Sequence, residues 1–103
     1  MDSLDRVFMA LADKTRREIV HMLATGEKTI TELTEPFEMS MAAVSKHVKV
    51  LEKAGLVRRR VEGRTHYLAL VPEQLAGALD WIGIYRYFWQ QRMDNLDKFL
   101  KEE

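Results

Sequence analysis

Residues 40–70 read SMAAVSKHVKVLEKAGLVRRRVEGRTHYLAL, and this stretch decides the fold. Ser40 is a favourable helix N-cap, and the residues that follow separate into an apolar and a polar face of a helix that Gly55 can close. The segments 56–61 and 64–70 have the composition of strands and flank a plausible tight turn. The stretch therefore predicts a helix followed by a two-stranded antiparallel ribbon.

The sequence before this stretch predicts three more helices. Apolar residues recur at three-to-four spacing within residues 4–11, which indicates a short first helix. Asp13 can act as the N-cap of a second helix, which we expect to end at Gly26 with a left-handed C-cap. Thr29 and Glu32 have the spacing of a capping box, so a third, short helix should begin there.

Two prolines mark further helix boundaries. Pro36 has no backbone amide hydrogen and disfavours helical geometry in the residue before it, so the third helix should end or kink close to it. Pro72 suits the first turn of a last helix, in which apolar residues recur at intervals of three and four. We therefore expect residues 1–103 to form a single, mainly α-helical domain with a two-stranded β-hairpin, and residues 72–103 to form a long C-terminal dimerisation helix.

Composition narrows the possible functions. The chain has 103 residues, of which 47% are hydrophobic and 31% charged, as in ordinary globular proteins. It has no cysteine, which excludes disulfides, thiolate metal sites and a cysteine nucleophile. No serine has acid and histidine partners in a catalytic motif, and no glycine-rich phosphate loop is present, so we do not expect an enzyme. The acidic amino terminus and the lack of a membrane-spanning apolar run lead us to expect a cytoplasmic protein with no membrane partner.

Charge is distributed unevenly although the formal net charge is zero. Residues 40–66 contain seven bases and two acids, whereas residues 1–39 contain five bases and eight acids, and residues 67–103 contain four bases and six acids. Confinement of the positive charge to one segment is what a localised polyanion-binding surface would produce.

The order of elements is that of a winged helix-turn-helix: a short helix, a tight connection, a second helix with a polar face, and a hairpin. A basic hairpin directly after that helix favours DNA binding over a merely solvated helix face. The second of these helices, which begins at Ser40, would be the recognition helix, and its predicted DNA contacts are Ser40, Ala42, Ser45, Lys46, His47 and Lys49. The hairpin of residues 56–70 would be the wing, and its predicted DNA contacts are Arg58, Arg60, Arg64 and His66.

Several of these side chains have alternative interpretations. His47 falls on the apolar arc of its helix, which favours packing or a phosphate hydrogen bond over base reading. His66 could reach a phosphate from the wing or be an exposed strand residue without a function. Arg16 and Arg17 could contact the DNA backbone, and surface pairing with Asp13 or Glu18 is an equal alternative.

A resemblance to a known family adds to this interpretation. The segments LADKTRREIVHML (residues 11–23) and ITELTEPFEMSMAAVSKHVKVLEKAGLVRRRVEGRTHYLAL (residues 30–70) resemble the ArsR/SmtB family of bacterial repressors. The resemblance implies a dimer joined through the first and last helices. It also implies binding to an imperfect palindrome of double-stranded DNA and repression of transcription until a signal lowers the affinity.

The chain departs from the metal-sensing members of that family. Its third helix, ITELTEPF, lacks their cysteine motif, and its last helix has Asp80, Asp94 and Asp97 but no histidine. A zinc site made of oxygen ligands alone at such spacing would be unusual, so we expect neither a metal site nor a cofactor. The last helix resembles a subset with aromatic residues at this position, and the resemblance does not assign a small-molecule effector.

The apolar residues of the last helix outnumber what one small core can cover. Its aromatic residues could form a ligand cage, but a two-fold dimer interface is the favoured interpretation. A winged-helix module that binds another protein instead of DNA is the alternative function. The predicted interface residues are Leu4, Val7, Phe8, Leu79, Ile82, Tyr85, Trp89 and Met93.

Overall fold

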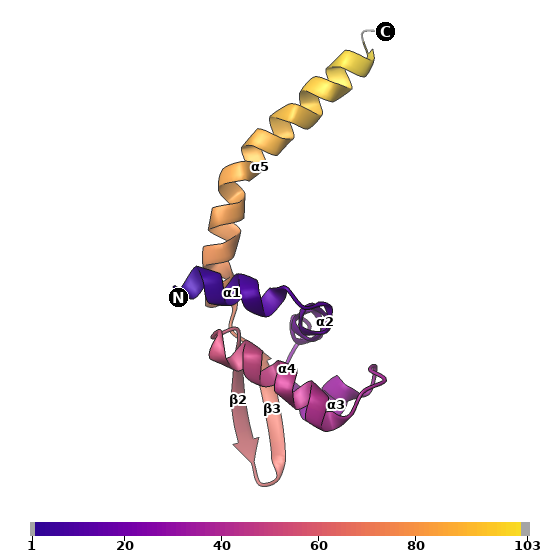
Figure 1. Cartoon of the computed structure of the whole chain (residues 1–103), viewed down its shortest axis with the longest axis vertical. Helices are drawn as coiled ribbons and strands as arrows, with labels where there is room; N and C mark the ends of the chain where they lie inside the picture. The colour runs from indigo at the N-terminus through magenta and orange to yellow at the C-terminus, as the bar shows by residue number, and fades with distance from the viewer. Residues whose placement is uncertain (1, 102–103) are drawn as a thin grey trace.

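The computed structural model describes residues 2–101 and is mainly helical. Helices and a small sheet form a body from which most of the last helix projects (Figure 1). In chain order the elements are α1 (Ser3–Leu11), α2 (Lys14–Leu23), β1 (Lys28–Thr29), α3 (Ile30–Thr34), α4 (Met41–Lys53), β2 (Val57–Glu62), β3 (Thr65–Leu70) and α5 (Pro72–Lys101).

The predicted helix starts are confirmed. The side chains of Asp13 and Ser40 each accept the backbone amide three residues further on, at 3.1 Å. Thr29 and Glu32 form the expected capping box, in which each side chain accepts the other residue's backbone amide at 3.1 Å. These bonds satisfy amides that have no partner within the helix. Because each bond joins residues only three positions apart, the local sequence is enough to predict where the helix starts.

The end of α2 differs from the expectation. The helix ends at Leu23, and Gly26 has a φ of 141°, far from the left-handed helical value of about 57°. The Thr25 hydroxyl donates to the Met22 carbonyl at 2.7 Å, and the Gly26 amide donates to the Leu23 carbonyl at 3.1 Å. Gly26 has the positive φ that favours glycine, but the C-cap is Ala24, so the helix ends earlier than predicted.

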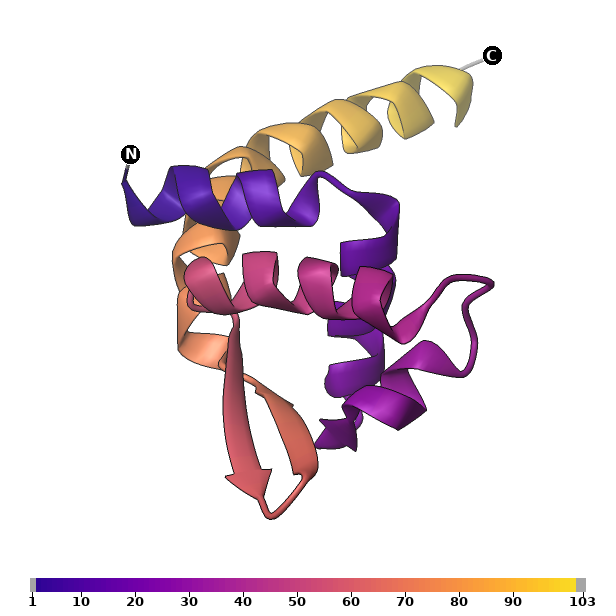
Figure 2. The ribbon, with the colours of Figure 1, turned by 60° about the horizontal axis from the view of Figure 1, so that its bottom comes forward.

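The hairpin of β2 and β3 is confirmed, and β1 adds a short third strand to it (Figure 2). The antiparallel sheet has the order β1-β3-β2, with Lys28 opposite Leu68 and Arg59 also opposite Leu68. β1 could not be predicted from the sequence, because a strand of two residues has no periodicity to recognise. Gly63, with a φ of 60°, makes the turn of the hairpin.

The core is formed between α1, α2, α3, α4 and the sheet, with a small contribution from α5. Val7 is only 1% exposed and lies in this core. The prediction that Val7 belongs to a dimer interface is therefore wrong, because its side chain is already covered within its own chain. The buried core residues are Val7, Ala10, Ile19, Leu23, Leu33, Val44, Val48, Leu51, Ala54, Leu56, Val57, Leu68 and Ala78.

Most of α5 lies outside the body. The radius of gyration is 18.0 Å, against about 13 Å expected for a compact chain of this length. Beyond Ala78, every large apolar side chain of α5 that the structure describes is at least 46% exposed. Phe8 of α1 meets Trp81 edge-to-face near the base of the projecting part, with 5.7 Å between ring centroids. Within residues 2–101, no helix combines the length and apolar character needed to cross a bilayer.

Candidate nucleic-acid interface

The orientation of α4 is fixed by its buried side. Val44, Val48 and Leu51 are fully buried. At about 100° per residue, the opposite side of the helix then carries Ala42, Lys46, Lys49 and Lys53. All four of these residues are exposed, so α4 presents three ammonium groups on one outward stripe. No ion pair involves these lysines in the described part of the chain.

Lys53 is a candidate that the sequence analysis did not select. Its place on the polar arc of the helix was visible in the sequence, one turn after Lys49. Ser40 and Ala42 lie at the opposite end of the stripe, where small side chains allow close approach to a partner. The free backbone amides at this helix start also favour an anion there.

A polar groove joins α4 to the wing. Ser45 and Lys49 line it from the helix, and Arg64 and His66 line it from the hairpin. The groove thus brings together two of the predicted helix residues and two of the predicted wing residues. Its full lining is Thr29, Ile30, Thr31, Met41, Ser45, Lys49, Arg59, Arg64, Thr65 and His66, around a volume of ≈ 460 Å³.

Thr31 is a second candidate missed by the sequence analysis. It is exposed, lies in the first turn of α3 and lines the same groove. The capping box at Thr29 and Glu32 already placed this residue at a helix start, and a hydroxyl in such a position can donate to a phosphate. A hydroxyl residue at a predicted helix start was therefore the sequence feature that could have identified Thr31.

The remaining wing arginines lie on the other face of the hairpin. Successive side chains of a strand point to opposite faces, and Arg59 bonds to Glu52 of α4, so Arg58 and Arg60 point away from α4. Arg60 pairs with Glu27 at 2.7 Å and also with Glu62. The hydrogen bond that Arg60 donates to Glu27 is the main reason that the pKa of Arg60 lies above its ordinary value.

These contacts count against Arg60 as a DNA contact, because two carboxylates already neutralise its guanidinium group. Its guanidinium carbon also lies 4.4 Å from the centre of the Tyr67 ring on the same face. Arg58 is exposed and has no ion pair among residues 2–101, but it lies on the same outer face. Of the four predicted wing residues, Arg64 and His66 therefore line the groove beside α4, whereas Arg58 and Arg60 lie on the outer face of the hairpin.

His47 contacts the body of the protein. Its Nδ1 lies 3.8 Å from the Asp13 carboxylate and 3.4 Å from Nη1 of Arg16, and its side chain is 26% exposed. The pKa of Asp13 is lowered chiefly by the backbone amide of Arg16, with a smaller contribution from the His47 charge. The geometry supports the packing interpretation of His47 and removes it from the outward stripe.

Arg16 and Arg17 make contacts that were not expected from the sequence. Arg16 donates through Nε to the Ala10 carbonyl at 2.6 Å and through Nη2 to the Met9 carbonyl at 3.2 Å. Arg17 donates through Nη1 to the Leu11 carbonyl at 2.8 Å. Both guanidinium groups therefore satisfy carbonyls at the end of α1, where cations are also favoured by the helix dipole.

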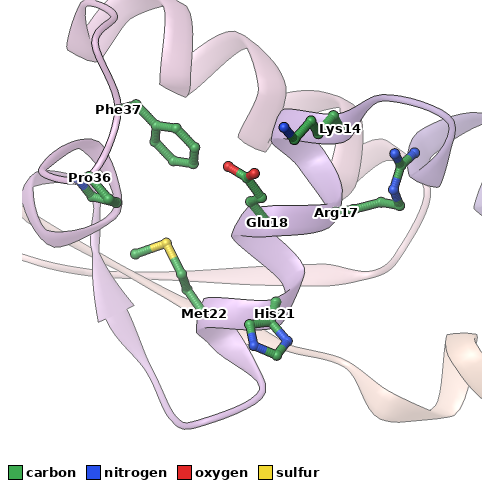
Figure 3. A pocket seen from close by; sticks show the side chains of 7 residues that line it. All are labelled: Lys14, Arg17, Glu18, His21, Met22, Pro36 and Phe37. Atoms are coloured by element: carbon green, nitrogen blue, oxygen red, sulfur yellow. The ribbon is translucent and has the colours of Figure 1, made fainter.

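A second hollow, of ≈ 630 Å³, lies between α2 and the α3–α4 connection (Figure 3). The Glu18 carboxylate points into it, between Lys14 and the ring of Phe37. Arg17 reaches instead toward the end of α1. Because acid and base are mixed here, this hollow lacks the positive lining that distinguishes the groove beside the wing.

The elements and this basic, groove-forming surface define a winged helix-turn-helix protein. The model of the arsR family of bacterial regulatory proteins matches residues 13–59. The HTH-type transcriptional regulator Rv2034 of Mycobacterium tuberculosis is 46% identical over 74 residues, which are 72% of this chain and 69% of that protein. The transcriptional repressor SdpR of Bacillus subtilis is 29% identical over 79 residues, which are 77% of this chain and 88% of SdpR.

The solved structures agree with the sequence matches. One of them is the homodimeric winged helix-turn-helix DNA-binding domain Mb0332 of Mycobacterium bovis, a possible ArsR-family transcriptional regulator. It has a TM-score of 0.68 and 25% sequence identity, and the match covers 99% of this chain and 85% of that one. The chain therefore belongs to the arsR family and is a DNA-binding transcriptional regulator. These findings do not support the alternative of a protein-binding module without DNA binding.

Proposed function

We propose that this protein is a homodimeric repressor that binds a palindromic operator with one α4 in each of two successive major grooves. The single observation that carries the proposal is the outward stripe of Lys46, Lys49 and Lys53 beside a groove that Arg64 lines. A two-fold dimer repeats this surface, and half-sites one helical turn apart would match it. Such a regulator would act in the cytoplasm, where bacterial DNA lies.

The two parts of the surface have different functions in this proposal. Lys46 and Lys49 stand on the helix, from which side chains reach the base edges of the major groove. Arg64 follows the hairpin turn and is exposed, so it suits a phosphate or the minor groove. Thr31 and Ser45 add hydroxyl donors along the groove between them.

The test begins with selection of the preferred operator from random duplexes, followed by footprinting of the DNA upstream of the protein's own gene. We expect a palindromic motif whose half-sites lie about 10 base pairs apart. Protection should cover both half-sites. A native protein that retains no sequence preference would contradict the proposal, and so would a motif without two-fold symmetry.

Dimerisation through α1 and α5 is the second part of the proposal. Trp89 and Met93 are 62% and 64% exposed, and Leu79 is 66% exposed, although all three are large and apolar. Ile82 and Tyr85 lie on the same side of the helix at three-residue intervals. Phe8 continues this surface onto α1 through its contact with Trp81. A second copy of the chain, related by a two-fold axis, would cover this surface, as closed symmetry favours.

Replacing Trp89 by Glu should disrupt the dimer, because a buried, unpaired carboxylate is costly at an interface. The matched control is Gln91→Glu, which introduces the same carboxylate about 200° away around the helix. Light scattering should give twice 12.0 kDa for the native protein and the control. A native monomer at micromolar concentration, or a dimer in both variants, would contradict this interface.

A further inference from the structure

Arg59 of β2 has all three of its guanidinium nitrogens engaged. Nη2 donates to Oε1 of Glu52 at 2.7 Å, and Nε donates to Oε2 of the same carboxylate at 3.3 Å. Nη1 lies 2.9 Å from Nδ1 of His66 in β3. One side chain therefore connects α4, β2 and β3, and it also lines the groove.

The location of this ion pair distinguishes it from an ordinary surface contact. The side chains of Arg59 and Glu52 are only 23% and 27% exposed, and the guanidinium group meets the carboxylate through two nitrogens. A planar fork of this kind fixes orientation as well as distance. The neighbouring Arg60 pair is more exposed, at 47%, and it joins the opposite face of the hairpin to Glu27.

The Arg59 bond also determines the proton position on His66. An arginine can only donate, so Nδ1 of His66 must accept and cannot carry a hydrogen in this arrangement. The neutral ring then carries its hydrogen on Nε2. His66 lines the groove together with Ser45 and Arg64, so this second nitrogen is available as a donor beside the proposed DNA surface.

We propose that Arg59 is a positioning residue, which holds the wing against the recognition helix and keeps His66 in the Nε2–H form that donates to a DNA phosphate. The inference rests on the proposed function. Arg59 itself need not touch DNA, because Glu52 and His66 occupy its three nitrogens. Its effect is exerted through the position of the wing and through the imidazole.

The first experiment follows the His66 ring without DNA. Long-range proton–nitrogen correlation spectra of the ¹⁵N-labelled dimer distinguish the two neutral tautomers. We expect the Nε2–H form in the native protein and a mixture of both forms in Arg59→Lys, which keeps the charge but loses the fork. Arg60→Lys is the matched control and should leave the His66 signals unchanged. A native His66 in the Nδ1–H form would overturn the proposal.

The second experiment is a double-mutant cycle in operator affinity. His66→Ala should weaken binding at least about tenfold, because it removes one phosphate hydrogen bond per protomer. Arg59→Lys should weaken binding about fourfold or more, because it leaves only part of the His66 rings of the two protomers in the donating form and also loosens the wing. The double variant should bind more tightly than the product of the two single losses predicts, because both changes remove the same His66 contact. Independent, multiplicative losses would contradict action through His66. His66→Gln, whose amide can donate from a position near Nε2, should restore much of the affinity lost in His66→Ala.

Two further outcomes separate this inference from the proposed function. If Arg59→Lys unfolds, Glu52→Gln provides the same test, since it removes the charge of the carboxylate and keeps its shape. If Arg59→Lys and Glu52→Gln both fold and bind the operator like the native protein while Lys46→Ala does not, the positioning role is wrong and the proposed function stands. If the native protein binds no DNA, the proposed function itself fails, and the tautomer spectra still report on the Arg59 contact.

Discussion

Arg64→Ala should lower the salt dependence of DNA binding without changing the preference for the operator. Arg64 is exposed beside the hairpin turn and has no ion pair among the described residues. Its guanidinium group is therefore free to meet a phosphate. A symmetric dimer loses two such contacts, so the slope of log affinity against log salt should become less steep by about 1.8.

This change in slope is large enough to measure. Between about 50 and 200 mM salt, the native protein should lose roughly twelvefold more affinity than the variant. Fluorescence anisotropy with labelled duplexes across that series gives both slopes. Arg60→Ala is the matched control, because Glu27 and Glu62 already pair with Arg60 on the opposite face of the hairpin. The slope of log affinity against log salt for this control should stay close to that of the native protein.

Lys46→Ala should behave differently in the same assay. A base contact contributes about 1–3 kcal/mol of operator affinity at each half-site and little affinity for a scrambled duplex. The variant should therefore lose operator binding and relax the preference at one symmetric pair of positions. Equal losses on both duplexes would refute our placement of α4 in the major groove, and an unchanged slope in Arg64→Ala would refute contact between the wing and DNA.

Three other measurements test the core, the helix cap and the metal prediction. Leu51→Ala removes a fully buried side chain and should lower the free energy of unfolding by about 2–5 kcal/mol. Val50→Ala changes a side chain that is 39% exposed and should lower the free energy of unfolding much less. Denaturant unfolding of both variants at the same protein concentration measures the difference, and equal losses would contradict the described core. The pKa of Asp13 lies below its ordinary value of 3.8, so its carboxylate stabilises the folded protein above that pH and the stabilisation is lost as the pH falls through the lowered pKa. The difference in unfolding free energy between the native protein and Asp13→Asn should therefore be full at neutral pH and narrow on acidification below 3.8, and a constant difference would exclude this role. Calorimetric titration with zinc should show no submicromolar site, since the chain has no cysteine and residues 2–101 contain no cluster of three potential ligands; tight stoichiometric binding that changes DNA affinity would overturn that prediction.

The sequence by itself determined the features that depend on neighbouring residues. The caps at Asp13, Thr29 and Ser40 were readable because each bond spans three residues. The two faces of α4 were readable because helical periodicity separates Val48 from Lys49 without reference to the rest of the fold. The wing followed from its turn and strand composition, and the family resemblance rested on the same local motifs.

Only the tertiary structure decided which of the basic side chains remain available. The register of β2 places Arg59 beside α4 and Arg60 on the opposite face, and a shift of one residue would exchange them. The contact of Arg16 with the end of α1 and the burial of Val7 likewise depend on how separate helices meet. Charge and hydrophobicity along the chain predict where a surface can form. Pairing between distant residues then decides which of its groups are free to bind, because one carboxylate or carbonyl within reach is enough to occupy an arginine.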